Sequence, residues 1–144
     1  MKKASRLFLA TVFLLGSLML AIATEEQARE AAAQAREQLR DLGFQVRNTY
    51  RTGALDRGNS TVFTRTFYQD NEYVLVVTGC AYARDIDVFV FDDDGSLIAQ
   101  DSKSSPTSVA TFQANYTGKY FIKVVMYDAT SAQNVHYAFQ YGYR

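Results

Sequence analysis

The residues best suited to chemistry in this sequence are aspartates, and they fall into two groups. Asp85 and Asp87 stand two positions apart in an apolar segment, and Asp92 to Asp94 follow it directly before a glycine. Oxygen-rich groups without cysteine suit Ca²⁺ rather than zinc. Because a strand rises about 3.3 Å per residue, Asp85 and Asp94 lie on the order of 25–30 Å apart along an extended strand. Each group would therefore need further ligands from a neighbouring loop.

Both aspartate groups also have an explanation that involves no metal. The run Asp93-Asp94-Gly95 is typical of a hairpin turn, and Asp85 and Asp87 could be solvated residues that protect the entrance to a strand. An EF-hand loop is absent, because residues 92–95 lack its alternating ligands and its later glutamate. The residues alone leave the choice between a calcium site and a metal-free turn open.

Most catalytic chemistry is excluded by the residues that are scarce. The chain has one cysteine, Cys80, and one histidine, His136, so it can form neither a disulfide framework nor a Cys/His zinc site. It has no P-loop, H-E-x-x-H, G-x-G-x-x-G or G-x-S-x-G motif. His136 has neither a nucleophile nor an orienting carboxylate assigned by any such motif. We therefore predict a protein that is not an enzyme, with a small hydrolase that uses carboxylates alone as an alternative.

The partner suggested by composition is a protein or a polymer. A formal net charge of zero argues against nucleic acid, whose binders usually carry a basic excess. The absence of tryptophan weakens a carbohydrate platform, although tyrosines could provide stacking surfaces. These tyrosines are Tyr50, Tyr68, Tyr82, Tyr116 and Tyr127.

A helix is predicted over residues 24–43, before any strand. Thr24 and Gln27 form a capping-box pattern, and Gly43 fits the position that ends a helix. Between them, small apolar residues recur at intervals of three and four, which gives one apolar stripe. The stripe consists of Ala28, Ala31, Ala32, Ala35, Leu39 and Leu42.

From residue 44 to residue 144 the hydrophobic period changes to two, which predicts strands separated by turns. The candidate strands are Phe44–Tyr50, Thr61–Tyr68, Tyr73–Cys80, Ile86–Phe91, Leu97–Asp101, Ser108–Ala114, Lys119–Tyr127 and Val135–Tyr143. About eight antiparallel strands preceded by one helix favour an all-β sandwich or jelly roll. In the strand that carries the aspartates, Ile86 and Val88 face the core, so Asp85 and Asp87 project together on the opposite face.

Residues 1–23 have the layout of a secretory signal peptide: a basic start, an uncharged apolar run and small residues at alternate positions up to Ala23. Cleavage after Ala23 would leave 12 basic and 15 acidic residues, a net charge of −3. We therefore predict a secreted or periplasmic protein, and an uncleaved segment that anchors the chain in the membrane is the alternative. In an oxidising compartment Cys80 is either buried in the sheet or pairs with a second copy as a disulfide homodimer.

The region from Tyr73 to Tyr143 resembles the bacterial pre-peptidase C-terminal domain, a secreted β-sandwich that is also described as collagenase-type binding domain-like. The features that carry the resemblance are Asp85-Ile86-Asp87-Val88-Phe89-Val90, the Asp94-Gly95 turn, Leu97 to Asp101, Val109 to Phe112, Thr117 to Val124 and Tyr137-Ala138-Phe139. Members of that family usually follow a secreted peptidase, and some bind calcium and collagen. The resemblance makes Asp85, Asp87 and Asp94 the candidate calcium ligands. No peptidase precedes the domain in this sequence.

The sequence thus predicts an exported, non-enzymatic β-sandwich module that binds a protein, peptide or polymer surface, and it leaves open whether Ca²⁺ steadies this module. A calcium-binding accessory domain of a secreted peptidase system is one alternative function. Self-association through Cys80 or through an uncovered sheet edge is another.

Overall fold

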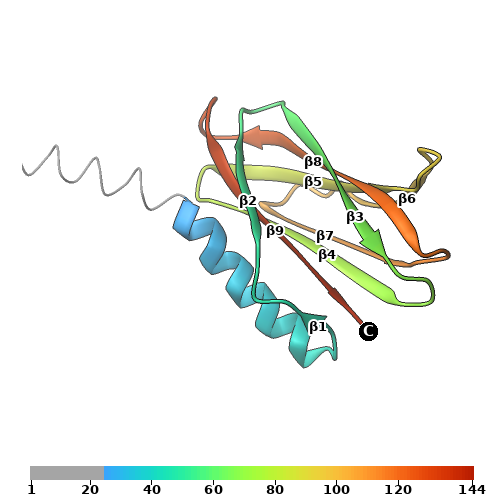
Figure 1. Ribbon diagram of the computed structural model, residues 1–144. Helices are drawn as coiled ribbons and strands as arrows, with labels where there is room; N and C mark the ends of the chain where they lie inside the picture. Colours follow the sequence, from blue (N-terminus) through green and yellow to red (C-terminus); the bar gives the residue numbers. More distant parts are fainter. Residues whose placement is uncertain (1–24) are drawn as a thin grey trace, which may run out of the picture.

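The computed structural model describes residues 25–144, which form two antiparallel β-sheets packed face to face with one helix outside them (Figure 1). The first sheet has the order β1-β9-β4-β7, with β2 also paired to β9, and the second has the order β3-β8-β5-β6. The strands are β1 (Gln45–Val46), β2 (Arg51–Leu55), β3 (Ser60–Phe67), β4 (Glu72–Gly79), β5 (Ala83–Phe91), β6 (Leu97–Asp101), β7 (Thr107–Gln113), β8 (Gly118–Ala129) and β9 (Val135–Tyr143). The predicted fold class is confirmed. The predicted signal peptide, residues 1–23, lies outside the described residues.

The core fills the space between the two sheets with side chains from alternate strand positions. On β5 and β8 the fully buried side chains are Ile86, Val88, Val90, Tyr120, Ile122, Val124 and Met126. Burying one large apolar side chain contributes about 1.5–3 kcal/mol. A slip of one residue would turn all of them outward, so the alternation fixes which face of each strand is free to form a site.

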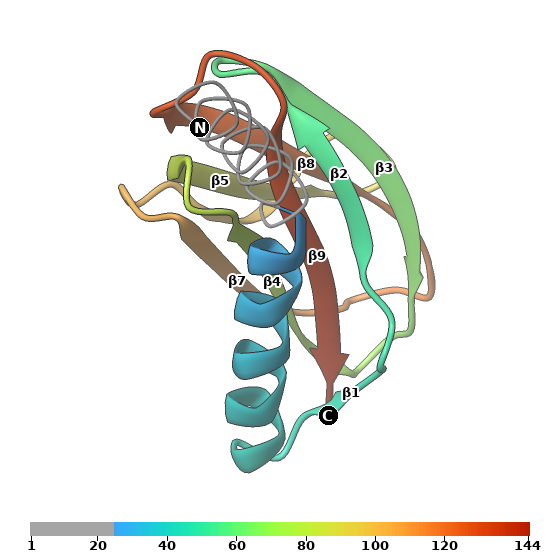
Figure 2. The same cartoon turned by 90° about the vertical axis from the view of Figure 1, so that its left-hand side faces the viewer.

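Residues 25–41 form a helix that lies on the outer face of the first sheet, across β4 and β9 (Figure 2). Ala28 and Ala32 are fully buried, because their small side chains let the helix approach the sheet closely. Two buried polar groups join the layers: Thr78 Oγ1 donates to the carbonyl of Ala28 at 2.9 Å, and Gln140 Nε2 donates to that of Ala32 at 2.6 Å. The first sheet is therefore covered on both of its faces.

The segment from Phe44 to Tyr50 is not the single strand that its sequence predicts. Only Gln45–Val46 pairs with β9, and the chain then leaves the sheet until Arg51. From Arg51 it pairs with β9 again as β2, a strand that the sequence prediction missed. The β2 sequence Arg-Thr-Gly-Ala-Leu has little β-branched or aromatic character, so residue preference gives no strand signal there.

Gly53, in the middle of β2, explains part of that weak signal. A Cβ atom at Gly53 would lie 2.7 Å from Tyr137 Oη and 2.9 Å from two carbons of its ring. Tyr137 is only 4% exposed and cannot easily move away. We therefore expect Gly53→Ala to lower the free energy of unfolding by about 1–3 kcal/mol in urea titrations. The control Ala54→Ser, at an exposed neighbour, should stay within about 0.5 kcal/mol of the wild type. Equal stability of both variants would contradict the expectation.

Candidate functional site

Asp85 and Asp87 lie together near the start of β5, on the side of the second sheet that faces away from the core. The pairing of β5 with β8 is irregular on both sides of Asp85, and it places Asp128 opposite Asp85. On the other flank of β5, Asp101 of β6 pairs with Val88, the residue after Asp87. Adjacent strands thus gather four carboxylates at this end of the sheet.

Both side chains of the pair are buried, so the alternative in which they are solvated is wrong. Asp85 is 8% exposed and Asp87 is 7% exposed. The loop of residues 102–106 covers them: Ser104 Oγ lies 3.5 Å from Asp85 Oδ2, and the Ile86 N–H donates to the carbonyl of Ser105 at 2.9 Å. Within the described residues, no donor reaches Asp85 Oδ1 or Asp87 Oδ1. Buried carboxylates without partners are costly, so this pair calls for a compensating charge.

The pKa of Asp87 reflects the same lack of a compensating charge. Burial, together with the neighbouring carboxylates of Asp85 and Asp101, raises the pKa of Asp87 from the usual 3.8 to about 6. When Asp87 is protonated it can donate a hydrogen bond to Asp85, and the pair then carries one negative charge. When both are ionised, two like charges face each other away from water.

Asp94 lies at the far end of β5, in the hairpin that leads to β6. Asp92 Oδ1 accepts hydrogen bonds from the N–H groups of Asp94 at 3.0 Å and Ser96 at 2.8 Å, and Gly95 has a φ of +83°. The predicted hairpin turn is confirmed. Within residues 25–144, Asp92, Asp93 and Asp94 are the one group of three candidate ligands whose atoms all lie within 4.8 Å of one another.

Of the three predicted ligands, the structure brings Asp85 and Asp87 together and leaves Asp94 with the hairpin. The buried pair fits Ca²⁺ better than the hairpin does, because it offers two carboxylate oxygens that nothing else engages among the described residues. Calcium takes six to eight oxygen ligands and tolerates irregular geometry, so hydroxyl, carbonyl and water oxygens could complete the shell. In the hairpin, by contrast, Asp92 already accepts two backbone hydrogen bonds.

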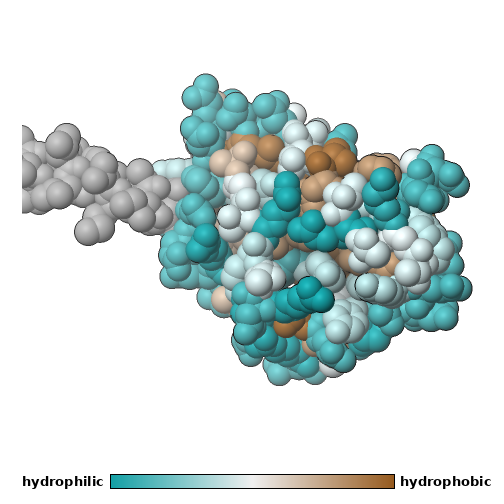
Figure 3. Space-filling model, viewed as in Figure 1, coloured by the Kyte–Doolittle hydropathy of each residue, from teal (hydrophilic) through white to brown (hydrophobic). Residues whose placement is uncertain are grey.

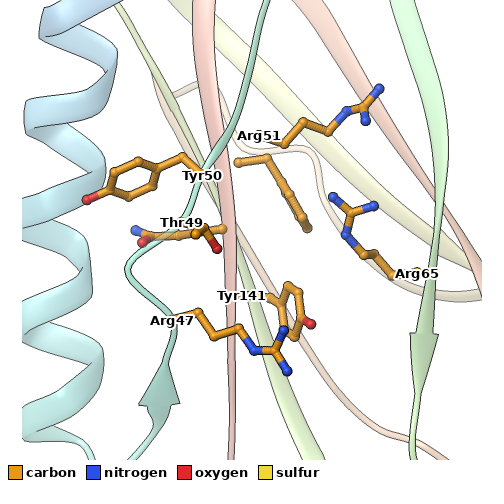
Figure 4. A pocket seen from close by; sticks show the side chains of 8 residues that line it. Arg47, Thr49, Tyr50, Arg51, Arg65 and Tyr141 are labelled. Carbon is orange, nitrogen blue, oxygen red and sulfur yellow. The ribbon is translucent and has the colours of Figure 1, made fainter.

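A second candidate site lies at the open edge of the sandwich, between β2 of one sheet and β3 of the other. It is a cavity of about 220 Å³ that is lined by three arginines, which lie one after another along it (Figure 4). Hydrophilic side chains gather across the middle of this face in Figure 3, with hollows between them. Its lining residues are Arg47, Thr49, Tyr50, Arg51, Arg65, Phe139, Gln140 and Tyr141.

These arginines were not predicted from the sequence, although one signal was present. Phe63, Arg65 and Phe67 occupy alternate positions of β3, so the strand pattern puts an arginine on an otherwise apolar face. Two of the tyrosines proposed as stacking surfaces lie at this edge: Tyr50 lines the first cavity, and Tyr68 lines an adjoining one.

Cys80 is free and 2% exposed, as expected if it packs in the sheet as a small apolar residue. A disulfide to a second copy would require this segment to open first. Within residues 25–144, no helix combines the length and the apolar character needed to cross a bilayer.

Fold and site together define a two-layer antiparallel β-sandwich with a buried acidic pair under one loop and a basic cavity at one edge. The fold is similar to that of the pre-peptidase C-terminal domain of collagenase from Bacillus anthracis, at 21% identity over 65% of this chain and 88% of that chain, with a TM-score of 0.50. The resemblance seen in the sequence is thus confirmed for the fold.

Other solved structures are similar at lower scores. They include PliG of Aeromonas hydrophila, a periplasmic inhibitor of g-type lysozyme, with 14% identity over 67% of this chain and 85% of that chain and a TM-score of 0.49. Another is the mitogen from Yersinia pseudotuberculosis, with 12% identity over 69% of this chain and 86% of that chain and a TM-score of 0.49. No family model and no curated protein matches the chain.

Proposed function

We propose that this protein is an exported, non-enzymatic β-sandwich module that binds Ca²⁺ at Asp85 and Asp87 and presents its surface to a protein, peptide or polymer. The observation that carries the proposal is the buried acidic pair, in which Asp85 Oδ1 and Asp87 Oδ1 have no partner among the described residues. Export is supported by the basic start, apolar run and small-residue end of residues 1–23.

A non-catalytic role is supported by the position of the same pair. Two close carboxylates, one with a raised pKa, could in principle serve as a general acid and base. Asp85 and Asp87 are, however, less than a tenth exposed beneath the loop of residues 102–106, so a substrate could reach them only after that loop moved. A cation, in contrast to a large substrate, does not require the loop to move away. Once bound, it would neutralise the pair and hold the loop against the sheet.

Thermal unfolding of the mature protein, purified from the exported fraction, tests the calcium site. If the dissociation constant is submillimolar to millimolar, as in extracellular modules, a tenfold excess of Ca²⁺ over that constant stabilises by about 1.4 kcal/mol relative to EDTA. For a chain of this size we expect the Tm to rise by roughly 3–6 °C. Asp85→Asn and Asp87→Asn should abolish the rise.

Asp94→Asn is the matched control, because it removes the same charge from the exposed hairpin and should retain the rise. Loss of the calcium effect in Asp94→Asn alone would move the site to the hairpin. A wild-type Tm that does not change with millimolar Ca²⁺ would overturn the metal proposal altogether.

A further inference from the structure

Two arginines occupy positions at the sandwich edge where the strand pattern expects apolar residues. Arg51 pairs with Phe139 in the β2–β9 register and shares its inward face, and Arg65 lies between Phe63 and Phe67 on the inward face of β3. Their guanidinium carbons lie 4.4 Å and 5.2 Å from the centre of the same Phe63 ring. Two cations from opposite sheets thus lie over one aromatic ring at this open edge.

These cations have no acidic partner within residues 25–144. The ion pairs there join Arg29 to Glu25, Arg40 to Glu37 and Arg144 to Glu72. The guanidinium groups of Arg47, Arg51 and Arg65 make a single hydrogen bond to the described chain, from Arg65 Nη1 to the carbonyl of Thr64 at 2.9 Å. Stacking on an aromatic ring engages the face of a guanidinium and leaves its N–H edge free. Apart from Arg65 Nη1, the N–H donors of these three arginines therefore remain for a ligand.

The arginine cavity continues into a second cavity of about 140 Å³, and Arg47 and Tyr141 line both. We call the two together the edge groove. The second cavity is also lined by Thr66, Tyr68, Asn71, Tyr73 and Tyr143. A basic end and a tyrosine-rich end in series suit an extended chain better than one compact molecule.

The chemistry of the edge groove indicates a peptide that carries carboxylates. Each arginine fork matches a carboxylate with two parallel hydrogen bonds. Arginine and tyrosine are also enriched at the centres of protein interfaces, where they contribute most of the binding energy. Residues 24–144 carry 12 basic and 15 acidic side chains, so this part of the chain has a negative net charge. Three of the 12 basic side chains nevertheless lie in the groove, which favours a negatively charged ligand there.

We infer that the edge groove binds an extended acidic peptide segment of a partner protein, with its carboxylates on Arg47, Arg51 and Arg65 and its neighbouring residues against Tyr68 and Tyr141. The inference rests on the proposed role as a binding module and names the class of partner. It does not depend on calcium, because Asp85 and Asp87 lie outside the residues that line the groove.

The test uses fluorescein-labelled hexaglutamate as the probe and fluorescence anisotropy of the exported protein at low salt. We expect saturable binding that Arg47→Gln weakens at least about tenfold, the loss typical of a charge-assisted hydrogen bond. Arg47 is exposed and stacks on no ring among the described residues, so this variant should fold normally. Arg65→Gln should weaken binding at least as much. Arg29→Gln, with the same change in net charge on the helix, is the control and should bind like the wild type.

Three outcomes would overturn the inference. The first is no binding of hexaglutamate at low salt. The second is equal weakening by Arg47→Gln and Arg29→Gln, which indicates only the overall charge of the protein. The third is groove-dependent binding of polygalacturonate without binding of hexaglutamate, which assigns the groove to an acidic polysaccharide. Each of these leaves the calcium-dependent Tm unaffected, so failure here is distinguishable from failure of the proposed function.

Discussion

In EDTA, the contribution of Asp87 to the free energy of unfolding should fall by up to about 3 kcal/mol as the pH rises from about 4 to about 7. The fold raises the pKa of this carboxyl from 3.8 to about 6 through burial and the neighbouring Asp85 and Asp101. Between those two values the native state binds more protons than the unfolded chain does, so stability falls with rising pH. The contribution is complete below the unfolded pKa and is lost as the pH passes the folded one.

Asp87→Asn isolates this effect from all other titrations. The amide has nearly the same shape, carries no charge, and can donate a hydrogen bond to Asp85 as the protonated acid does. We expect the variant to match the wild type near pH 4 and to be more stable than it at pH 7 in EDTA. Urea unfolding at a series of pH values and constant ionic strength measures the difference.

Asp94→Asn is again the control, since it removes the same charge outside the buried pair and so measures the effect of net charge alone. Parallel curves for Asp87→Asn and the wild type would show that the pair is solvated or otherwise compensated. The effect should also shrink when Ca²⁺ is present, because the cation supplies at neutral pH what the proton supplies at acidic pH. The proton and the cation would then compete for one site.

The position of the acidic pair could be predicted from the sequence, whereas its burial could not. Alternation along β5 correctly placed Asp87 opposite to Ile86 and Val88, because a period of two depends only on the local chain. Burial could not be derived in the same way, since it comes from the loop of residues 102–106, which folds over the pair from a distant point in the chain. The separation of Asp94 from the pair followed from strand length alone.

The edge groove could not be predicted from the strand preferences of its residues. β2 has a weak strand signal because Gly53 makes room for Tyr137, so the edge next to β3 was missing from the predicted sheet. Because no strand was predicted there, the sequence did not indicate which face Arg51 occupies or that it lies near Arg65. The remaining signal in the sequence was an arginine at an inward position of β3. Its place in a basic cavity follows only from the structure, in which Arg51 of the opposite sheet lies over the same Phe63 ring as Arg65.

Phe67→Ala should destabilise the fold strongly, with a loss of about 3–5 kcal/mol in the free energy of unfolding. Phe67 is fully buried at the end of β3, where the two sheets meet. Its ring centre lies 4.3 Å from that of Tyr73 and 5.4 Å from those of Phe112, Tyr120 and Tyr141. Removing it leaves a cavity that four large rings cannot fill without leaving their own packing.

Tyr68→Ala is the matched control, since it removes an aromatic ring from the next residue in the chain, which is 60% exposed. We expect its free energy of unfolding to stay within about 0.5 kcal/mol of the wild type. Calorimetry should place the Tm of Phe67→Ala roughly 10–20 °C lower. Similar losses in both variants would contradict a packing role for Phe67. Because Phe67 also supports Tyr141 in the edge groove, Phe67→Ala should weaken peptide binding through loss of shape, whereas Tyr68→Ala tests the groove contact in an intact fold.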